Sequence, residues 1–135
     1  MKQVLVEKAK EAMKNAYAPY SSFKVGAALL CKDGSIYTGC NIENASFSPT
    51  VCAERVAIFK AVADGKRDFS AIAVCGGKDG VLSDKCCYPC GVCRQVMSEF
   101  CNSDFTIYVM SESDVKEYTL SQLLPESFGP EDVNI

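Results

Sequence analysis

The chain has 135 residues, of which 48% are hydrophobic and 23% are charged, as in an ordinary globular protein. This length favours a single domain, residues 1–135, with a substantial hydrophobic core. The net charge is −3 and no cluster of Lys or Arg occurs. Because phosphate contacts require a basic surface, we expect no nucleic-acid partner and favour a small-molecule ligand.

The N-terminal segment is charged and amphipathic, so we do not expect a signal peptide. No apolar run approaches the roughly 20 residues that a membrane span needs, and no membrane partner is expected. The chain contains nine cysteines and no histidine. In a reducing cytoplasm, the compartment that we expect, clustered cysteines are typical of metal sites or buried thiols.

The first half of the chain predicts a helix, a hairpin and a second helix. Apolar residues at helical spacing run from Val4 to Ala16, and this helix should end before Pro19. A buried strand follows, and Asp33-Gly34 is a typical hairpin turn. The expected strands are Phe23–Cys31 and Ser35–Cys40, and the second helix is expected from about Val51 to Ala63.

The second half predicts a third strand, a long loop, a third helix and two more strands. The loop GGKDGVLSDKCCY is expected at the surface, and Pro89 is expected to open the helix that follows. The expected elements are the strands Phe69–Cys75, Phe105–Met110 and Val115–Thr119, the helix Cys90–Cys101 and a helical turn at Leu120–Leu124. The order α-β-β-α-β-α-β-β indicates an α/β fold with at least one parallel crossover. We expect a three-layer αβα sandwich with a mixed central sheet of about five strands.

Two short strings carry the chemistry: Cys52-Ala53-Glu54 and Pro89-Cys90-Gly91-Val92-Cys93. They supply three thiolates and one carboxylate that need not be a ligand. Three protein ligands with an open position are typical of a catalytic zinc, whereas a structural zinc has four. Zinc deaminases combine a Cys-rich ligand set with a non-ligand Glu that transfers protons. Hydrolytic deamination is therefore the leading hypothesis.

The positions of the thiols on the predicted helices favour their ionised form. Cys90 and Cys93 are three residues apart, share a helix face and are expected in a first turn, as Cys52 is in the preceding helix. Zinc with three thiolates has an excess negative charge, and we expect Arg55 to offset it by donating hydrogen bonds to ligand sulfurs. Glu54 suits proton transfer, but its spacing from Cys52 does not by itself bring it to the metal.

The whole chain resembles the small zinc-dependent cytidine deaminases of the three-cysteine type. The matching strings, in order, are AYAPYSSFKVGAAL, GCNIENAS, CAER, PCGVCRQ and LLPESF. The resemblance implies that Cys52, Cys90 and Cys93 bind one Zn²⁺, with water as the fourth ligand. It implies that Glu54 activates this water, that hydroxide attacks C4, and that cytidine and deoxycytidine become uridine and deoxyuridine plus ammonia, as in pyrimidine salvage.

The resemblance also implies substrate-binding residues. Asn41 and Glu43 match positions that hold ribose hydroxyls, and Phe23 matches an aromatic wall beside the pyrimidine. The backbone of Ala53 matches a group that reads the base edge. The family forms homotetramers whose subunits share active sites, and Phe128 fits an aromatic residue that a neighbouring subunit contributes.

Several simpler interpretations stay open beside these. The free cysteines at 31, 40, 75 and 101 are expected to be buried small hydrophobic residues, and Cys86 and Cys87 to be exposed loop thiols. Phe23 and Phe128 could serve packing alone, and Asn41, Glu43 and Asn44 could cap a loop. The loop before Pro89 is longer than the family pattern, and Tyr88 stands where Ser is common.

Other functions also remain open. A blasticidin-type aminonucleoside deaminase shares the CAE and PCxxC strings. A polynucleotide deaminase would need a basic channel that this chain lacks. A structural zinc domain would use a fourth protein ligand such as Cys86 or Cys87.

Overall fold

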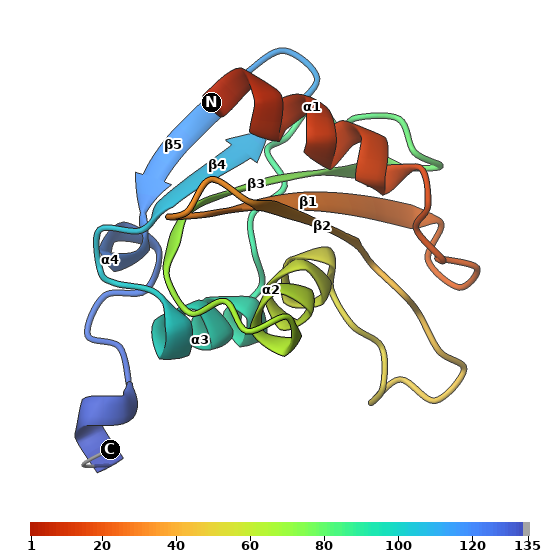
Figure 1. Ribbon diagram of the computed structural model, residues 1–135. Helices are drawn as coiled ribbons and strands as arrows, with labels where there is room; N and C mark the ends of the chain where they lie inside the picture. The colour runs from red at the N-terminus through yellow and green to blue at the C-terminus, as the bar shows by residue number, and fades with distance from the viewer. Residues whose placement is uncertain (134–135) are drawn as a thin grey trace.

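The computed structural model describes residues 1–133, and its helices and strands follow the predicted order (Figure 1). The strands are β1 (Phe23–Cys31), β2 (Ile36–Cys40), β3 (Phe69–Lys78), β4 (Thr106–Met110) and β5 (Val115–Thr119). The helices are α1 (Lys2–Met13), α2 (Ala53–Ala63), α3 (Gly91–Phe100) and α4 (Leu120–Leu123), and a 3-10 turn spans Pro130–Val133.

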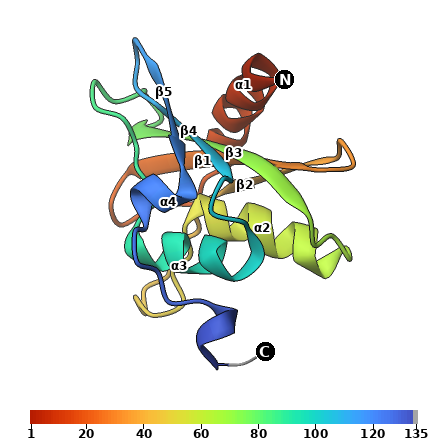
Figure 2. The same cartoon turned by 90° about the vertical axis from the view of Figure 1, so that its left-hand side faces the viewer.

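The five strands form one sheet in the order β2-β1-β3-β4-β5. Only β3 and β4 are parallel, because the chain between them crosses over through α3, while the other neighbours pair antiparallel. Helix α1 covers one face of the sheet, and α2 and α3 cover the other (Figures 1 and 2). The predicted three-layer αβα sandwich with a mixed five-stranded sheet is therefore confirmed.

Two apolar cores lie on opposite faces of the sheet. The larger one packs β1, β3 and β4 against α2 and α3, and the smaller one packs the same strands against α1. Strand β3 is buried along nearly its whole length, as expected for a central strand covered on both faces.

Glycines let two helices approach the sheet closely. A Cβ atom on Gly26 of β1 would lie 2.0 Å from the carbonyl oxygen of Ala9 in α1. A Cβ atom on Gly39 of β2 would lie 2.4 Å from the carbonyl oxygen of Ala53, the first residue of α2. The absence of a side chain at Gly39 therefore sets how near the first turn of α2 lies to the sheet.

Several predicted boundaries are wrong, for identifiable reasons. Helix α1 ends at Met13, before the predicted Ala16, and the Tyr17 amide then donates to the carbonyl of Asn41 in an isolated bridge. Helix α2 starts later than predicted because Val51 pairs with Ile42. Pro89 does not open α3, because the extended Cys90 stands between them as the N-cap residue.

The structure also tests the predicted burial of the free cysteines and the predicted lack of a membrane-spanning segment. All nine cysteines are unpaired; Cys31 and Cys75 are buried as predicted, while Cys40 and Cys101 are half-buried. Among residues 1–133, no helix has both the length and the apolar character needed to cross a bilayer.

Candidate metal centre and active site

Three cysteine sulfurs converge where the N-termini of α2 and α3 meet. The Sγ atoms of Cys52, Cys90 and Cys93 all lie within 4.8 Å of one another. Those of Cys52 and Cys90 are 3.7 Å apart, far beyond the roughly 2.05 Å of a disulfide bond. Within residues 1–133, no further His, Cys, Asp or Glu belongs to this cluster.

Local helix geometry brings the three thiols together. Cys52 and Cys90 are the N-cap residues of α2 and α3, both with extended backbones, and neither thiol caps its own helix. Cys93 is the third residue of α3 and is fully buried. The prediction that Cys90 lies in the first turn is therefore wrong by one position, yet Cys90 and Cys93 still face the same point.

The donor set fits zinc. Zn–S bonds of about 2.3 Å at tetrahedral angles place two sulfurs about 3.8 Å apart, which agrees with the observed Cys52–Cys90 separation of 3.7 Å. Three protein donors leave a fourth coordination position open for a small molecule. This matches a catalytic zinc better than a closed structural one.

The three thiols are electrostatically unequal. Hydrogen bonds from Cys93, Arg55 and Cys90 lower the pKa of Cys52 to about 5, so that Cys52 is a thiolate at neutral pH. The hydrogen bond between Cys93 and Cys52 raises the pKa of Cys93. Arg55 donates from Nη2 to the Cys52 sulfur at 3.4 Å, the contact that we expected from the sequence. The Nε of Arg55 is buried without a hydrogen-bond partner.

Glu54 is the buried carboxylate beside this cluster. Only 3% of its surface is exposed, and burial raises the pKa of Glu54 to about 7. The negative charge of Cys52 raises it further, while hydrogen bonds from its own backbone amide and from Cys93 lower it. A carboxyl group with a pKa near neutrality can both accept and return a proton. Spacing along the helix could not show this proximity to the sulfurs.

The loop before Pro89 differs from its prediction. Strand β3 continues through Gly76 and Gly77 to Lys78, so the loop begins later than expected. Cys86 and Cys87 are half-buried, not exposed, and burial raises the pKa of Cys87 to about 12. The Cys87 amide donates to the carbonyl of Met110, which ties the loop to the end of β4.

The other side of this loop is held by an aromatic pair. The hydroxyl groups of Tyr88 and Tyr118 lie 3.1 Å apart, and their rings pack edge to face. Tyr88 thus fastens the loop to β5.

Three of the predicted substrate-binding residues lie at the start of β1, directly after β2 and at the start of α2. Phe23 is 39% exposed and is the first residue of β1. The Asn41 side chain accepts a hydrogen bond from the backbone amide of Val25 through Oδ1 and donates one to the backbone carbonyl of Phe23 through Nδ2, both at 2.8 Å. Asn41 therefore holds the backbone that carries Phe23. Ala53 is buried at the start of α2.

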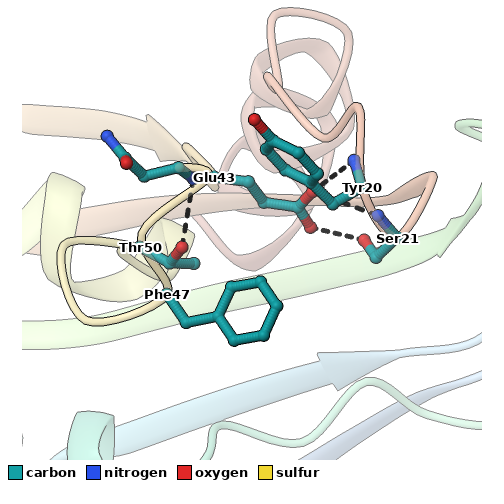
Figure 3. Close-up of a pocket in the computed structure, with 6 residues that line it drawn as sticks. Tyr20, Ser21, Glu43, Phe47 and Thr50 are labelled. Carbon is teal, nitrogen blue, oxygen red and sulfur yellow. Dashed lines mark hydrogen bonds between the residues drawn. The ribbon is translucent and has the colours of Figure 1, made fainter.

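Glu43 lines an open pocket of about 360 Å³, shown in Figure 3. The pocket is lined by Tyr20, Ser21, Glu43, Asn44, Phe47 and Thr50. The Glu43 carboxylate accepts hydrogen bonds from the Tyr20 and Ser21 amides and from the Ser21 hydroxyl, and these hold the pKa of Glu43 below its usual value. Asn44 accepts from the Ser46 amide, so its predicted role in capping the loop is confirmed.

Sequence reasoning did not identify Tyr20, Ser21, Phe47 and Thr50 as pocket residues. The polar turn that ends at Ser22, which has φ 60°, brings Tyr20 and Ser21 to Glu43. Phe47 is 81% exposed, and an aromatic side chain in an otherwise polar loop was the one available signal for it.

Phe128 lies in the segment that follows α4 and is 61% exposed. Its main-chain carbonyl accepts hydrogen bonds from Gln95 and Ser98 of α3. In Figure 1 this segment lies at the opposite end of the helical layer from loop 41–50.

The chain is similar to proteins of one known family. The family model described as "Cytidine and deoxycytidylate deaminase zinc-binding region" matches residues 1–109. A cytidine deaminase of Sporosarcina psychrophila is 50% identical over 131 residues, which cover 96% of this chain and 93% of that protein. A cytidine deaminase of Halalkalibacterium halodurans is 49% identical over 134 residues, 98% of each chain.

Solved structures agree with these matches. The cytidine deaminase from Burkholderia pseudomallei superposes with a TM-score of 0.88 at 44% identity, covering 95% of this chain and 99% of that one. The enzyme from Mycobacterium tuberculosis superposes with a TM-score of 0.79 at 38% identity, covering 95% and 97%. On the strength of the sulfur cluster, the buried glutamate and these matches, the chain belongs to the zinc-dependent cytidine and deoxycytidylate deaminase family.

Proposed function

We propose that this protein is a cytidine deaminase that converts cytidine and deoxycytidine, with one water molecule, to uridine and deoxyuridine with release of ammonia. The observation that carries the proposal is the buried carboxylate of Glu54 next to three sulfurs that leave a fourth coordination position open. A closed structural site would need neither of these features.

The zinc site is assigned to Cys52, Cys90 and Cys93, whose thiols gather at two helix N-termini. When bound there, zinc supplies Lewis-acid chemistry and lowers the pKa of a water molecule. Arg55 acts as a positioning residue that offsets the negative charge of the thiolates through its contact with Cys52.

Glu54 is assigned the proton transfers. It would take a proton from water and deliver it to the pyrimidine N3 and then to the departing amine, and its burial beside the sulfurs, which raises the pKa of the carboxyl group, supports this role. Because Glu54 is buried, its carboxylate is shielded from bulk water and from competing proton exchange.

The substrate is expected to bind on the surface between the sulfur cluster with Glu54 and the pocket lined by Glu43. Phe23 and the backbone of Ala53 border the pyrimidine, and the ionised Glu43 accepts a ribose hydroxyl. The Asn41 side chain already makes two hydrogen bonds to the backbone of β1. It therefore contributes to substrate binding through its remaining side-chain N–H and by holding Phe23 in place.

We further propose that the protein is a homotetramer in which residues 1–135 form one domain of each subunit. We also propose that it is cytoplasmic and serves pyrimidine salvage. The exposed aromatic rings of Phe59 on α2 and Phe128 beyond α4 support subunit contacts on the helical face. Phe128 reaches a neighbouring active site in this arrangement. Light scattering coupled to gel filtration measures the assembly, and a monomer at micromolar concentration would contradict it.

The first test follows ultraviolet absorbance after zinc-loaded protein is mixed with cytidine, beside the variant Glu54→Gln. We expect conversion to uridine by the wild type, a loss of at least about 100-fold in the variant and an unchanged zinc content in both. No conversion of either nucleoside by the loaded wild type would overturn the proposal. Blasticidin would then be the substrate to test, and equal activity of both proteins would remove Glu54 from the mechanism.

A further inference from the structure

Arg94 joins the metal-ligand loop to the C-terminal part of the chain. Its Nε donates to the carbonyl of Pro89 at 2.8 Å, and its Nη1 donates to the carbonyl of Leu123 at 2.7 Å. Pro89 is fully buried and directly precedes Cys90, while Leu123 is the last residue of α4. A single part-buried guanidinium therefore contacts the backbone next to a zinc ligand and the backbone that leads to Phe128.

Two more side chains of α3 hold the same C-terminal segment, residues 120–128. Gln95 donates to the Phe128 carbonyl at 2.8 Å, and Ser98 donates to it at 3.2 Å. These bonds end on a main-chain atom, so they fix where the segment lies without contacting the Phe128 ring. They attach the segment to α3 independently of Arg94.

The contacts of Arg94 form a short path from metal to segment. A metal bound by Cys90 and Cys93 fixes the N-cap and the third residue of α3, and with them the orientation of Pro89. Hydrogen bonds from a guanidinium to carbonyl oxygens are charge-assisted and directional, so a shift of Pro89 weakens the geometry at Leu123. Lysine cannot reproduce this, because its single ammonium lacks the planar fork.

We propose that Arg94 couples the metal site to the C-terminal segment, so that metal binding orders residues 120–128 and the anchored segment in turn slows metal loss. The two effects are reciprocal at equilibrium, because a coupling free energy acts equally on the ordering of the segment and on the affinity for the metal, and the higher affinity appears as slower release. The link to catalysis rests on the proposed function of Phe128, but the coupling itself does not. Arg94 is a positioning residue in this account.

The experiment uses full-length protein and two readouts other than deamination. The first is the rate at which zinc passes to a chromogenic chelator. The second is amide hydrogen exchange of residues 120–128 with and without zinc. For Arg94→Lys we expect zinc release to accelerate by about 10-fold or more, and exchange around Leu123 to lose its dependence on zinc, while Gln95 and Ser98 still hold Phe128.

The matched control is the double variant Gln95→Ala, Ser98→Ala, which frees Phe128 but keeps the Arg94 contacts. We expect faster exchange near Phe128 and zinc release within about 2-fold of the wild type. Zinc release as fast as in Arg94→Lys would show general loosening of α3 and overturn the coupling.

Wild-type protein alone gives a further test that does not depend on a variant's folding. Removal of zinc should raise exchange in residues 120–128 several-fold, and unchanged exchange would overturn the inference. Because neither readout uses cytidine, failure of the coupling is distinguishable from failure of the deaminase activity.

Discussion

The guanidinium of Arg55 lies 3.4 Å from the Cys52 sulfur, and the two residues are the third residue and the N-cap of the same helix, α2. The Cys52 side chain makes no capping hydrogen bond to the backbone of α2. Its thiolate faces the guanidinium of Arg55 in the first turn of that helix. Together with the hydrogen bond from Cys93, which is the larger cause, this contact lowers the pKa of Cys52, whose sulfur lies within 4.8 Å of the other two.

Replacing Arg55 with Ala should therefore weaken zinc binding by about 10- to 100-fold, because the thiolates lose the partner that balances their charge. Metal content after dialysis against a chelator, measured by atomic absorption, provides the test. Arg67→Ala is the control, since Arg67 lies beyond the far end of α2 and donates to the carbonyls of Val62 and Lys66. Equal zinc content in the Arg55 variant and the control would contradict this role.

The pKa of Glu54 predicts a pH dependence of stability in the metal-free protein. Unfolding returns the pKa from about 7 toward 4.5, so between these pH values the folded state keeps a proton that the unfolded state releases. The contribution of Glu54 to stability therefore falls as pH rises from 4.5 to 7, by about 3 kcal/mol at roughly 1.4 kcal/mol per pKa unit.

Glu54→Gln removes this titration. The difference in unfolding free energy between wild type and variant, measured with urea at pH 5 and pH 8, should change by about 2–3 kcal/mol in favour of the variant at the higher pH. A difference that stays constant between the two pH values would show that Glu54 is not desolvated in the metal-free fold.

Gly39→Ala tests how closely α2 must approach the sheet. The new methyl group would lie 2.4 Å from the Ala53 carbonyl oxygen and 2.6 Å from the Ala57 nitrogen, both backbone atoms of α2. We expect a loss of about 1–3 kcal/mol in unfolding free energy and a lower zinc content, because Cys52 moves with the helix. Thermal unfolding and metal analysis measure both effects.

Gly91→Ala is the matched control for that variant. Gly91 is directly next to Cys90, but a Cβ atom there meets nothing within 4 Å. Because Ala is the better helix former, its stability should be equal or higher by up to about 1 kcal/mol. If both glycine variants lose zinc equally, the packing of α2 on β2 does not set the metal geometry.

Glu43→Gln should lower kcat/KM for cytidine by about 10-fold or more, since a charge-assisted hydrogen bond to the ribose is weakened. The variant also alters the turn at Ser21, whose hydroxyl and amide bond to the same carboxylate. A 2′,3′-dideoxy substrate separates the two effects. We expect the variant and the wild type to differ little on it, and an equal loss on both substrates would assign Glu43 to the turn alone.

The pairing of Cys90 with Cys93 could be predicted because their short spacing at a helix start is a recognisable pattern, and the resemblance to the deaminases added Cys52, 38 residues away. Arg55 could also be predicted, because it is adjacent in sequence to Glu54. The contacts of Arg94 and Gln95 could not be predicted in this way. Their acceptors are the main-chain carbonyls of Leu123 and Phe128, and every residue type offers such an acceptor.

The end of β3 shows a second limit of sequence reasoning. The pair Gly76-Gly77 is typical of a loop, yet both residues are buried in the strand. A Cβ atom on Gly77 would lie 1.6 Å from the Val81 carbonyl oxygen, so the glycine lets the following turn fold back across the strand. Sequence alone did not distinguish this use of glycine from its use in a flexible loop.

The separation of Cys52 from Cys90 has a kinetic consequence. The two ligands are 38 residues apart and come from different helices, with β3 between them. The complete ligand set cannot exist until β3 has joined the sheet and α3 has docked beside α2, and closing such a loop carries an entropic cost. In refolding, tight zinc capture should therefore follow assembly of the sheet, so that the metal stabilises a late state and does not nucleate the fold.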